Sequence, residues 1–177
     1  MVDEKLGSPI IEFGEGQEMI AVGDVVPDVE LRMMAEDGPI IVSSSEILGA
    51  GRVVLFAVPG AFTTGCSQRH FPGYVEQAAN MSAAGVDSIA CISVNDAFVM
   101  DAWGKAQGAG DILMLADPDA TFAHAVGMAV DASGFGLGLR SKRYAIVFQD
   151  GVVEEFLPEE NGFSIEASTA ACVLAKL

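Results

Sequence analysis

The sequence predicts an α/β fold in which a mixed central sheet is flanked by helices on both faces. Short apolar runs alternate with helical stretches along most of the chain, as strands that are covered on both faces would. The last two apolar runs, 144–148 and 152–157, flank Asp150-Gly151, a pair typical of an antiparallel hairpin turn. Strand–helix units first and a hairpin last predict a sheet with both parallel and antiparallel strands.

The first elements follow from apolar runs and from proline. Residues 52–58, which are apolar from Val53 onwards, predict a buried strand that stops at Pro59. A helical stretch follows over about 66–84, and Pro72 inside it should kink or break that helix, because proline has no N–H to donate. Residues 86–94 predict the second buried strand.

The later elements carry start and stop signals. Asp96 is expected to cap a helix over 96–107, and a third strand is expected over 112–116. A short helix is predicted over 121–128, and Ser168 is expected to cap the last helix. The apolar side of that last helix is formed by Ala170, Val173, Leu174 and Leu177.

The domain organisation is simple. Residues 1–20 mix acidic, glycine and apolar residues without a clear period, so we interpret them as an N-terminal extension that can form a short hairpin. No repeat, low-complexity tract or linker divides residues 21–177, so we expect one domain there. A chain of 177 residues is long enough to bury a sizeable core.

Composition excludes several classes of partner. Hydrophobic residues make up 51% of the chain and the net charge is −16, so we expect a globular protein that binds neither nucleic acid nor anionic membranes. The start of the chain lacks the features of a signal peptide, and no apolar run approaches the roughly 20 residues of a membrane span. Three cysteines without paired spacing, Cys66, Cys91 and Cys172, favour a reducing compartment, and we expect a cytoplasmic protein.

The chemical centre is predicted around Cys66, which follows a buried strand and opens a helix. The N–H groups and dipole at a helix start favour the thiolate, which is the nucleophilic form. Thr63 can bring its hydroxyl to the sulfur or to a bound oxygen, and Pro59 can exclude water without offering a donor. The N–H groups of Gly65 and Cys66 can stabilise charge on a departing oxygen. A lone cysteine is commonly an inert buried residue, but these neighbours favour reactivity.

A basic cluster supplies the second candidate group. Three of the nine Lys and Arg residues lie within 140–143. We interpret Arg140 and Lys142 as a solvated basic turn, whereas Arg143 borders the strand 144–148 and is placed to face inward. A fixed guanidinium there would hold Cys66 as the thiolate and stabilise a departing oxygen.

His70 offers an alternative chemistry because it lies four residues after Cys66. Such a pair occurs in metal sites and in Cys–His hydrolases. Further metal ligands are distant in the sequence, so we expect no metal and no cofactor, and we interpret His70 as a supporting residue that packs beside the site or hydrogen-bonds a loop. A dithiol oxidoreductase is disfavoured because the chain has no Cys-x-x-Cys pair.

The motif Pro59-x-x-x-Thr63-x-x-Cys66 resembles the active-site motif of peroxiredoxins, and longer segments resemble their type II/V (atypical) subfamily. The likeness runs from about residue 20 to the end. Thr64 departs from the pattern, since the subfamily usually has proline there. The matching segments are 58–63, 65–67 with His70 and 72–73, 90–99, 115–118 and 140–144.

The resemblance implies a thioredoxin-like fold, a homodimer, and reduction of hydrogen peroxide or alkyl hydroperoxides. It makes Cys66 the peroxidatic cysteine that becomes a sulfenic acid, Thr63 the catalytic threonine, Pro59 the shielding proline and Arg143 the family arginine. A thioredoxin-fold redox-sensing or chaperone-like binding protein, without efficient turnover, is the alternative from another class.

Recycling of the sulfenic acid needs a second thiol. Some subfamily members have a resolving cysteine at the spacing of Cys91, and others have one in the loop before the last helix, where residues 162–168 contain none. Cys91 lies in the middle of a predicted strand, so a buried structural role is its default, and Cys172 is expected to pack inside the last helix. We therefore favour a one-cysteine cycle with glutathione and glutaredoxin, or thioredoxin, as reductant, with a resolving role for Cys91 as the alternative.

Overall fold

A computed structural model describes residues 18–177 of the chain. The hairpin expected within the N-terminal extension falls on residues 1–17, outside the described residues, and stays a prediction. At the other end of that extension, Ile20 is buried in the core and donates its N–H to the carbonyl of Val126. Within the described part, no helix has both the length and the apolar character needed to cross a membrane.

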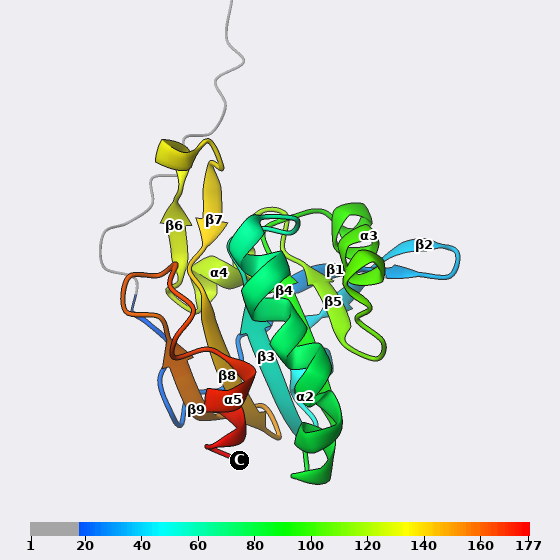
Figure 1. Cartoon of the computed structure of the whole chain (residues 1–177), viewed down its shortest axis with the longest axis vertical. Coiled ribbons are helices and arrows are strands. Elements are labelled where there is room, and N and C mark those ends of the chain that lie inside the picture. The colour runs from blue at the N-terminus through cyan, green and yellow to red at the C-terminus, as the bar shows by residue number, and fades with distance from the viewer. Residues whose placement is uncertain (1–17) are drawn as a thin grey trace, which may run out of the picture.

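The centre of the molecule is a seven-stranded mixed sheet, as expected (Figure 1). The β3–β4 and β4–β5 pairs are parallel, and the remaining pairs are antiparallel. In spatial order the strands are β2 (Gly38–Ser43), β1 (Glu30–Ala35), β5 (Leu113–Ala116), β4 (Ser88–Ser93), β3 (Arg52–Ala57), β8 (Tyr144–Gln149) and β9 (Val152–Pro158). A separate two-stranded hairpin consists of β6 (Ala129–Asp131) and β7 (Leu139–Ser141).

Helices cover both faces of the sheet, which confirms the predicted layers. Helices α2 and α5 lie side by side on one face together with α3, and α1 and α4 pack on the other (Figure 1). Their bounds are α1 (Ser44–Leu48), α2 (Phe71–Ala83), α3 (Ala97–Gln107), α4 (Thr121–Ala125) and α5 (Ala170–Leu174), with a π-helical turn at Cys66–His70 and a 3₁₀ turn at Ser133–Phe135.

Strand β3 shows why the apolar runs could be read from the sequence. Successive side chains of a strand point to opposite faces, so Phe56 packs with α2 and α3 while Leu55 packs with α1 and α4. Both faces of β3 are buried. Each fully buried side chain of this kind contributes roughly 1.5–3 kcal/mol of transfer free energy. A continuous apolar run is the result.

The β1–β2 hairpin was not predicted. Strand β2 is an edge strand that leaves Ile40 and Ile41 exposed, so it has neither an alternating nor a fully buried pattern. Its turn does carry a signal, because Asp37-Gly38 is the same type of pair that predicted the last hairpin, and Gly38 has φ +125°. Helix α1 and the β6–β7 hairpin, with three residues per strand, were also too short to detect.

Two caps and one proline can be compared with their predictions. Asp96 caps α3 by accepting the N–H of Val99 at 2.8 Å, as expected. The prediction for Ser168 is wrong, because Thr169 caps α5 by accepting the N–H of Cys172 at 3.2 Å. Pro72 lies in the first turn of α2, where no N–H is needed, and the turn before it widens to a π-helix.

Candidate active site

Cys66 lies where the chain leaves β3 and begins to coil towards α2. Its side chain is 1% exposed and belongs to the core on the α2 face of the sheet. The turn that it opens is π-helical, since the N–H of Phe71 bonds to the carbonyl of Cys66. Widened turns of this type are frequent at functional sites. The predicted strand–helix junction is therefore present, with a π-turn that the sequence did not indicate.

The loop before Cys66 is held by short polar contacts. The Thr63 hydroxyl donates to the carbonyl of Gly60 at 2.7 Å, so its hydrogen is used and its oxygen lone pairs remain as acceptors. Asn95 Oδ1 accepts the N–H of Ala61 at 3.0 Å and the Ser93 hydroxyl at 2.8 Å. Asn95 thus ties this loop to the end of β4, a role that only the tertiary structure reveals.

Arg143 reaches the sulfur, as its position at the start of a strand predicted. Its side chain is 3% exposed, and Nη2 donates to Cys66 Sγ at 3.3 Å. The Nε–H donates to the carbonyl of Phe163 at 3.3 Å, and the backbone N–H donates to the carbonyl of Gly162 at 2.7 Å. A buried guanidinium held on both sides in this way is a fixed positive charge beside the sulfur of Cys66.

His70 binds Arg143 and a distant loop. Arg143 Nη1 lies 2.9 Å from His70 Nδ1, and because a guanidinium has donors only, Nδ1 must be the acceptor. The other nitrogen, Nε2, therefore carries the hydrogen and donates to the carbonyl of Ser168 at 2.9 Å. Both ring nitrogens are engaged away from the sulfur, which disfavours a Cys–His hydrolase pair and agrees with the predicted loop contact.

The His70 ring is neutral at physiological pH. Burial, together with the positive charge of Arg143, lowers its pKa to about 4, against the opposing effects of the Ser168 carbonyl and of Glu159. The ring also contacts Phe56 and Tyr74 edge-on, at centroid distances of 5.5 Å each. A neutral acceptor therefore faces the arginine, and no second positive charge competes with it.

The interpretation of Arg140 as part of a solvated turn is wrong. Its Nη1 donates to the carbonyl of Val94 and its Nε to the carbonyl of Leu137, each at 2.9 Å. A Cβ on Gly60 would lie 3.3 Å from Arg140 Nη1 and 3.1 Å from Thr63 Cγ2, so the loop passes close to this guanidinium. The guanidinium of Arg140 is thus fixed by two backbone carbonyl groups beside the site.

The two other cysteines differ in surroundings. All three cysteines are free thiols. Cys91 is fully buried in β4, between Phe56 of β3 and Met114 of β5. Burial raises the pKa of the Cys91 thiol, the nearby Cys66 raises it further, and Arg143 opposes this. Cys172 is half-buried, and its Sγ donates to the carbonyl of Glu166 at 3.2 Å.

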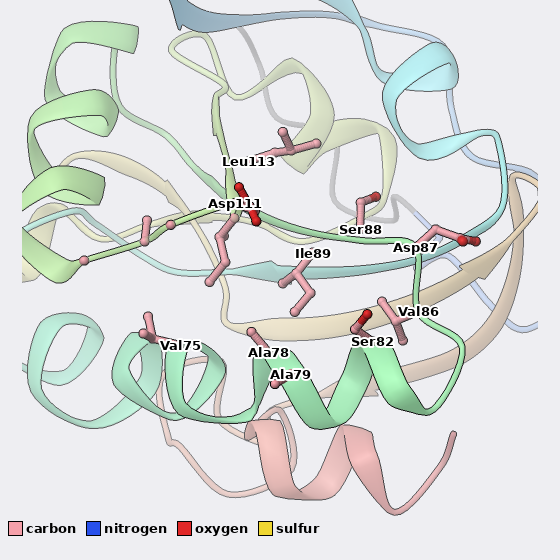
Figure 2. A pocket seen from close by; sticks show the side chains of 14 residues that line it. Val75, Ala78, Ala79, Ser82, Val86, Asp87, Ser88, Ile89, Asp111 and Leu113 are labelled. Atoms are coloured by element: carbon pink, nitrogen blue, oxygen red, sulfur yellow. The ribbon is translucent and has the colours of Figure 1, made fainter.

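A sizeable hollow of the molecule lies away from the candidate site. A hollow of about 460 Å³ lies between α2, the start of β4 and the loop before β5, and it is lined by Ala78, Ser82, Asp87 and Asp111 among others (Figure 2). None of the site residues named above lines it. Within residues 18–177, no group of three or more His, Cys, Asp or Glu side chains is arranged to hold a metal ion.

The fold and the site together define a thiol-based redox protein, with one cysteine beneath a buried arginine at a strand–helix junction. Comparison with known proteins narrows the class. The family model "Redoxin" matches residues 21–173. The chain is 48% identical to peroxiredoxin-2E-2, chloroplastic, of Oryza sativa subsp. japonica over 81% of this chain and 66% of the rice protein, slightly under two thirds of that protein's length.

Two further relatives are matched over most of their length. The chain is 44% identical to peroxiredoxin-2B of Arabidopsis thaliana over 74% of this chain and 82% of that protein. The crystal structure of reduced Prx3 from Vibrio vulnificus in complex with H₂O₂ superposes with a TM-score of 0.85 at 49% identity, covering 89% of this chain and 98% of that one. The chain belongs to the peroxiredoxin family, and the expected thioredoxin-like fold is confirmed.

Proposed function

We propose that the protein is a thiol-dependent peroxidase that reduces hydrogen peroxide and alkyl hydroperoxides in antioxidant defence and redox homeostasis. The observation that carries this proposal is the 3.3 Å contact between Arg143 Nη2 and the buried sulfur of Cys66. It places a permanent positive charge beside the only group at the site that can act as a nucleophile on oxygen. Membership in the peroxiredoxin family and the superposition on a peroxide complex support the same reaction.

The reaction is a two-electron displacement. The Cys66 thiolate attacks the nearer, protonated oxygen of the hydroperoxide, so that an S–O bond forms while the O–O bond breaks. The electron pair of that bond leaves on the farther oxygen, which takes up a proton and departs as water or an alcohol. Cys66 is oxidised to a sulfenic acid. The side chains and backbone groups of the site suffice for this step, so the proposal includes no metal and no organic cofactor.

Each neighbouring group has a role in this proposal. Arg143 holds the thiolate and stabilises charge on the departing oxygen. Thr63, whose hydrogen is donated to Gly60, offers its lone pairs to the peroxide hydroxyl. Pro59 is buried beside the loop and excludes water. The N–H groups of Gly65 and Cys66 are further donors for negative charge on oxygen.

Trapping the sulfenic acid tests the proposal. Reduced protein is mixed with an equimolar amount of hydrogen peroxide in the presence of a dimedone-type probe, and the labelled residue is identified by mass spectrometry. Prompt and stoichiometric labelling of Cys66 is expected, with Cys66→Ser as the blank. Slow or substoichiometric labelling would favour the alternative, a thioredoxin-fold redox-sensing or chaperone-like protein without efficient turnover.

The proposed cycle uses one cysteine, with glutathione and glutaredoxin, or thioredoxin, as the reductant. A resolving cysteine must attack the sulfenic acid as a thiolate, but Cys91 lies in a central strand and burial raises its pKa. Cys172 lies in α5, and its Sγ is bonded to a backbone carbonyl. An external thiol is therefore the more accessible partner for Cys66.

A homodimer is also part of the proposal. Three large aromatic side chains near the site are exposed: Phe62 (57%) in the loop before Cys66, Phe98 (64%) in the first turn of α3, and Phe135 (77%) in the 3₁₀ turn. The loop of Phe62 is tied to the segment preceding Phe98 through Asn95, and Phe135 contacts Phe163, whose carbonyl accepts from Arg143. Exposed aromatic residues on segments that are each linked to the site in this way favour a self-association surface.

Sedimentation velocity tests the dimer. The chain is expected to sediment as a dimer, and Phe98→Asp is expected to shift it towards the monomer, because it places a charge in the apolar surface. A wild-type monomer at micromolar concentration would overturn the proposed dimer.

We also place the protein in the cytoplasm, since its three free thiols fit a reducing compartment. The chloroplastic name of the rice relative applies to that protein.

A further inference from the structure

A buried carboxylate that the proposed reaction does not use lies just after β9. Glu159 is 4% exposed, and its partners are hydrogen-bond donors of the following loop. Oε1 accepts the N–H and the hydroxyl of Ser168, at 2.8 and 2.6 Å, and the N–H of Glu166 at 2.9 Å. Oε2 accepts the N–H of Ala167 at 3.2 Å and the hydroxyl of Ser164 at 3.1 Å.

These bonds keep Glu159 ionised. Burial raises its pKa, but the hydrogen bonds from Ser168, Glu166 and Ala167 outweigh burial and lower the pKa to about 2. Among the described residues, no Lys, Arg or His forms a salt bridge with Glu159. Five donors aimed at one carboxylate therefore fix the loop in a single conformation.

Ser168 connects this fixed loop to His70 through hydrogen bonds. The Ser168 carbonyl accepts the hydroxyl of Tyr74 at 2.6 Å and Nε2–H of His70 at 2.9 Å. The Ser168 hydroxyl has given its hydrogen to Glu159, so towards His70 Nε2, 3.2 Å away, it presents a lone pair. Two acceptors therefore face Nε2, and they favour the tautomer that carries its hydrogen there.

The tautomer of His70 determines whether Arg143 faces a hydrogen-bond acceptor or a donor at Nδ1. With the hydrogen on Nε2, the lone pair of His70 Nδ1 accepts from Arg143 Nη1 at 2.9 Å, and Arg143 Nη2 is left to donate to Cys66 Sγ at 3.3 Å. With the hydrogen on Nδ1, a donor would face a donor and the guanidinium would have to move. The contact between Arg143 and the Cys66 sulfur thus depends on the hydrogen bond between Ser168 and Glu159, through His70.

We propose that Glu159 is a positioning residue for the reaction of Cys66, acting through Ser168, His70 and Arg143 in turn. The inference rests on the proposed function, because it assigns Glu159 a part in the same thiolate chemistry. Glu159 itself touches neither the sulfur nor the peroxide. Its effect is to keep the guanidinium aimed at the sulfur, so its loss lowers the reactivity of Cys66 in a protein that is still folded.

Glu159→Gln tests the proposal, because it keeps the size of the side chain and turns one acceptor into a donor facing other donors. The second-order rate of peroxide reaction is expected to fall by about 10- to 100-fold, as for a small misplacement of a reacting group. The thiolate absorbance of Cys66 near 240 nm at neutral pH should fall as well. The matched control is Glu160→Gln, which makes the same charge change at the exposed neighbouring residue and should leave both values unchanged.

A double-variant cycle separates positioning from mere loop stability. His70→Ala removes the link itself, so adding Glu159→Gln to it should cost little more, whereas independent effects would multiply. Ser168→Ala keeps the carbonyl and removes the hydroxyl, and it should lower the rate in the same direction. If Glu159→Gln does not fold, the cycle of Ser168→Ala with His70→Ala gives the same comparison. Folded variants with wild-type rate and thiolate absorbance, or losses that multiply, would overturn the proposal.

Failure of this inference can be told apart from failure of the proposed function. If the wild-type protein does not react with hydrogen peroxide, the peroxidase proposal fails. The alkylation rate of Cys66 by iodoacetamide requires the thiolate but no peroxide chemistry, and it can be compared between the wild type and Glu159→Gln in either case. A lower alkylation rate in the variant supports the positioning role, and an equal rate refutes it.

Discussion

Arg143 Nη1 and His70 Nδ1 lie 2.9 Å apart, so the arginine that faces the sulfur is itself held by a neutral histidine. An arginine next to a carboxylate would have its charge neutralised and would favour the thiolate less. A neutral imidazole acceptor orients the guanidinium without neutralising it. Two unlike side chains thereby give Cys66 a fixed and uncompensated positive neighbour.

The first prediction concerns Arg143→Ala. The variant should lose about 10²- to 10³-fold in the rate of peroxide reaction, the usual cost of one lost donor in the transition state. Stopped-flow fluorescence of Trp103 can follow the reaction, since Trp103 Nε1 donates to Ser67 beside Cys66 at 2.9 Å. Lys142→Ala is the control and should react normally. Full activity of Arg143→Ala would refute its role.

The second prediction concerns the Thr63 hydroxyl. Thr63→Val keeps the branched shape and removes both the donor to Gly60 and the acceptor for the peroxide, so we expect a rate loss of about 10²- to 10³-fold. Thr64→Val makes the same change at the exposed neighbour and should have little effect. Equal rates for the two variants would contradict a specific role for Thr63.

The third prediction is a pH dependence of stability caused by His70. Its pKa in the folded protein is about 4, below the ordinary 6.5, so between these values the unfolded chain binds a proton that the folded protein excludes. The free energy of unfolding should therefore be fully present above pH 6.5 and fall by about 3 kcal/mol as the pH drops towards 4.

Urea unfolding at several pH values measures this effect. His70→Asn cannot titrate, so its free energy of unfolding should depend less on pH between 6.5 and 5, a window above the ordinary range of carboxyl groups. The comparison uses the slope and not the absolute stability, because the variant loses packing as well. The same slope in both proteins would show that His70 is not the titrating group.

The fourth prediction concerns recycling. Because Cys91 is buried in β4 and its pKa is raised, Cys91→Ala should retain peroxide turnover with glutathione and glutaredoxin, or with thioredoxin. Mapping disulfides after oxidation by peroxide and quenching in denaturant provides the direct measurement. An abundant link between Cys66 and Cys91 would replace the one-cysteine cycle with a two-cysteine cycle.

The parts of the fold that could be predicted are those with two buried faces. Residues 52–58 and 144–148 read as apolar runs because β3 and β8 are covered by helices on both sides. Strand β2 gave no such pattern, because it lies at the edge of the sheet, pairs only with β1 among the described strands and leaves Ile40 and Ile41 exposed. The cap at the start of α5 was predicted one residue too early, because Ser168 and Thr169 are both good capping residues and Ser168 is instead hydrogen-bonded to Glu159.

The amino-acid sequence by itself determined which cysteine is proposed to react and which local residues surround it, because Pro59, Thr63 and Cys66 lie within one short loop whose spacing is visible in the chain. It also indicated Arg143, since a strand start next to a basic turn is a local pattern. Only the tertiary structure brought Glu159 and Ser168 to His70, and Arg140 to Val94. The physical reason is that these contacts join segments distant in the chain, where hydrogen-bond direction and burial, and not spacing, decide which groups meet.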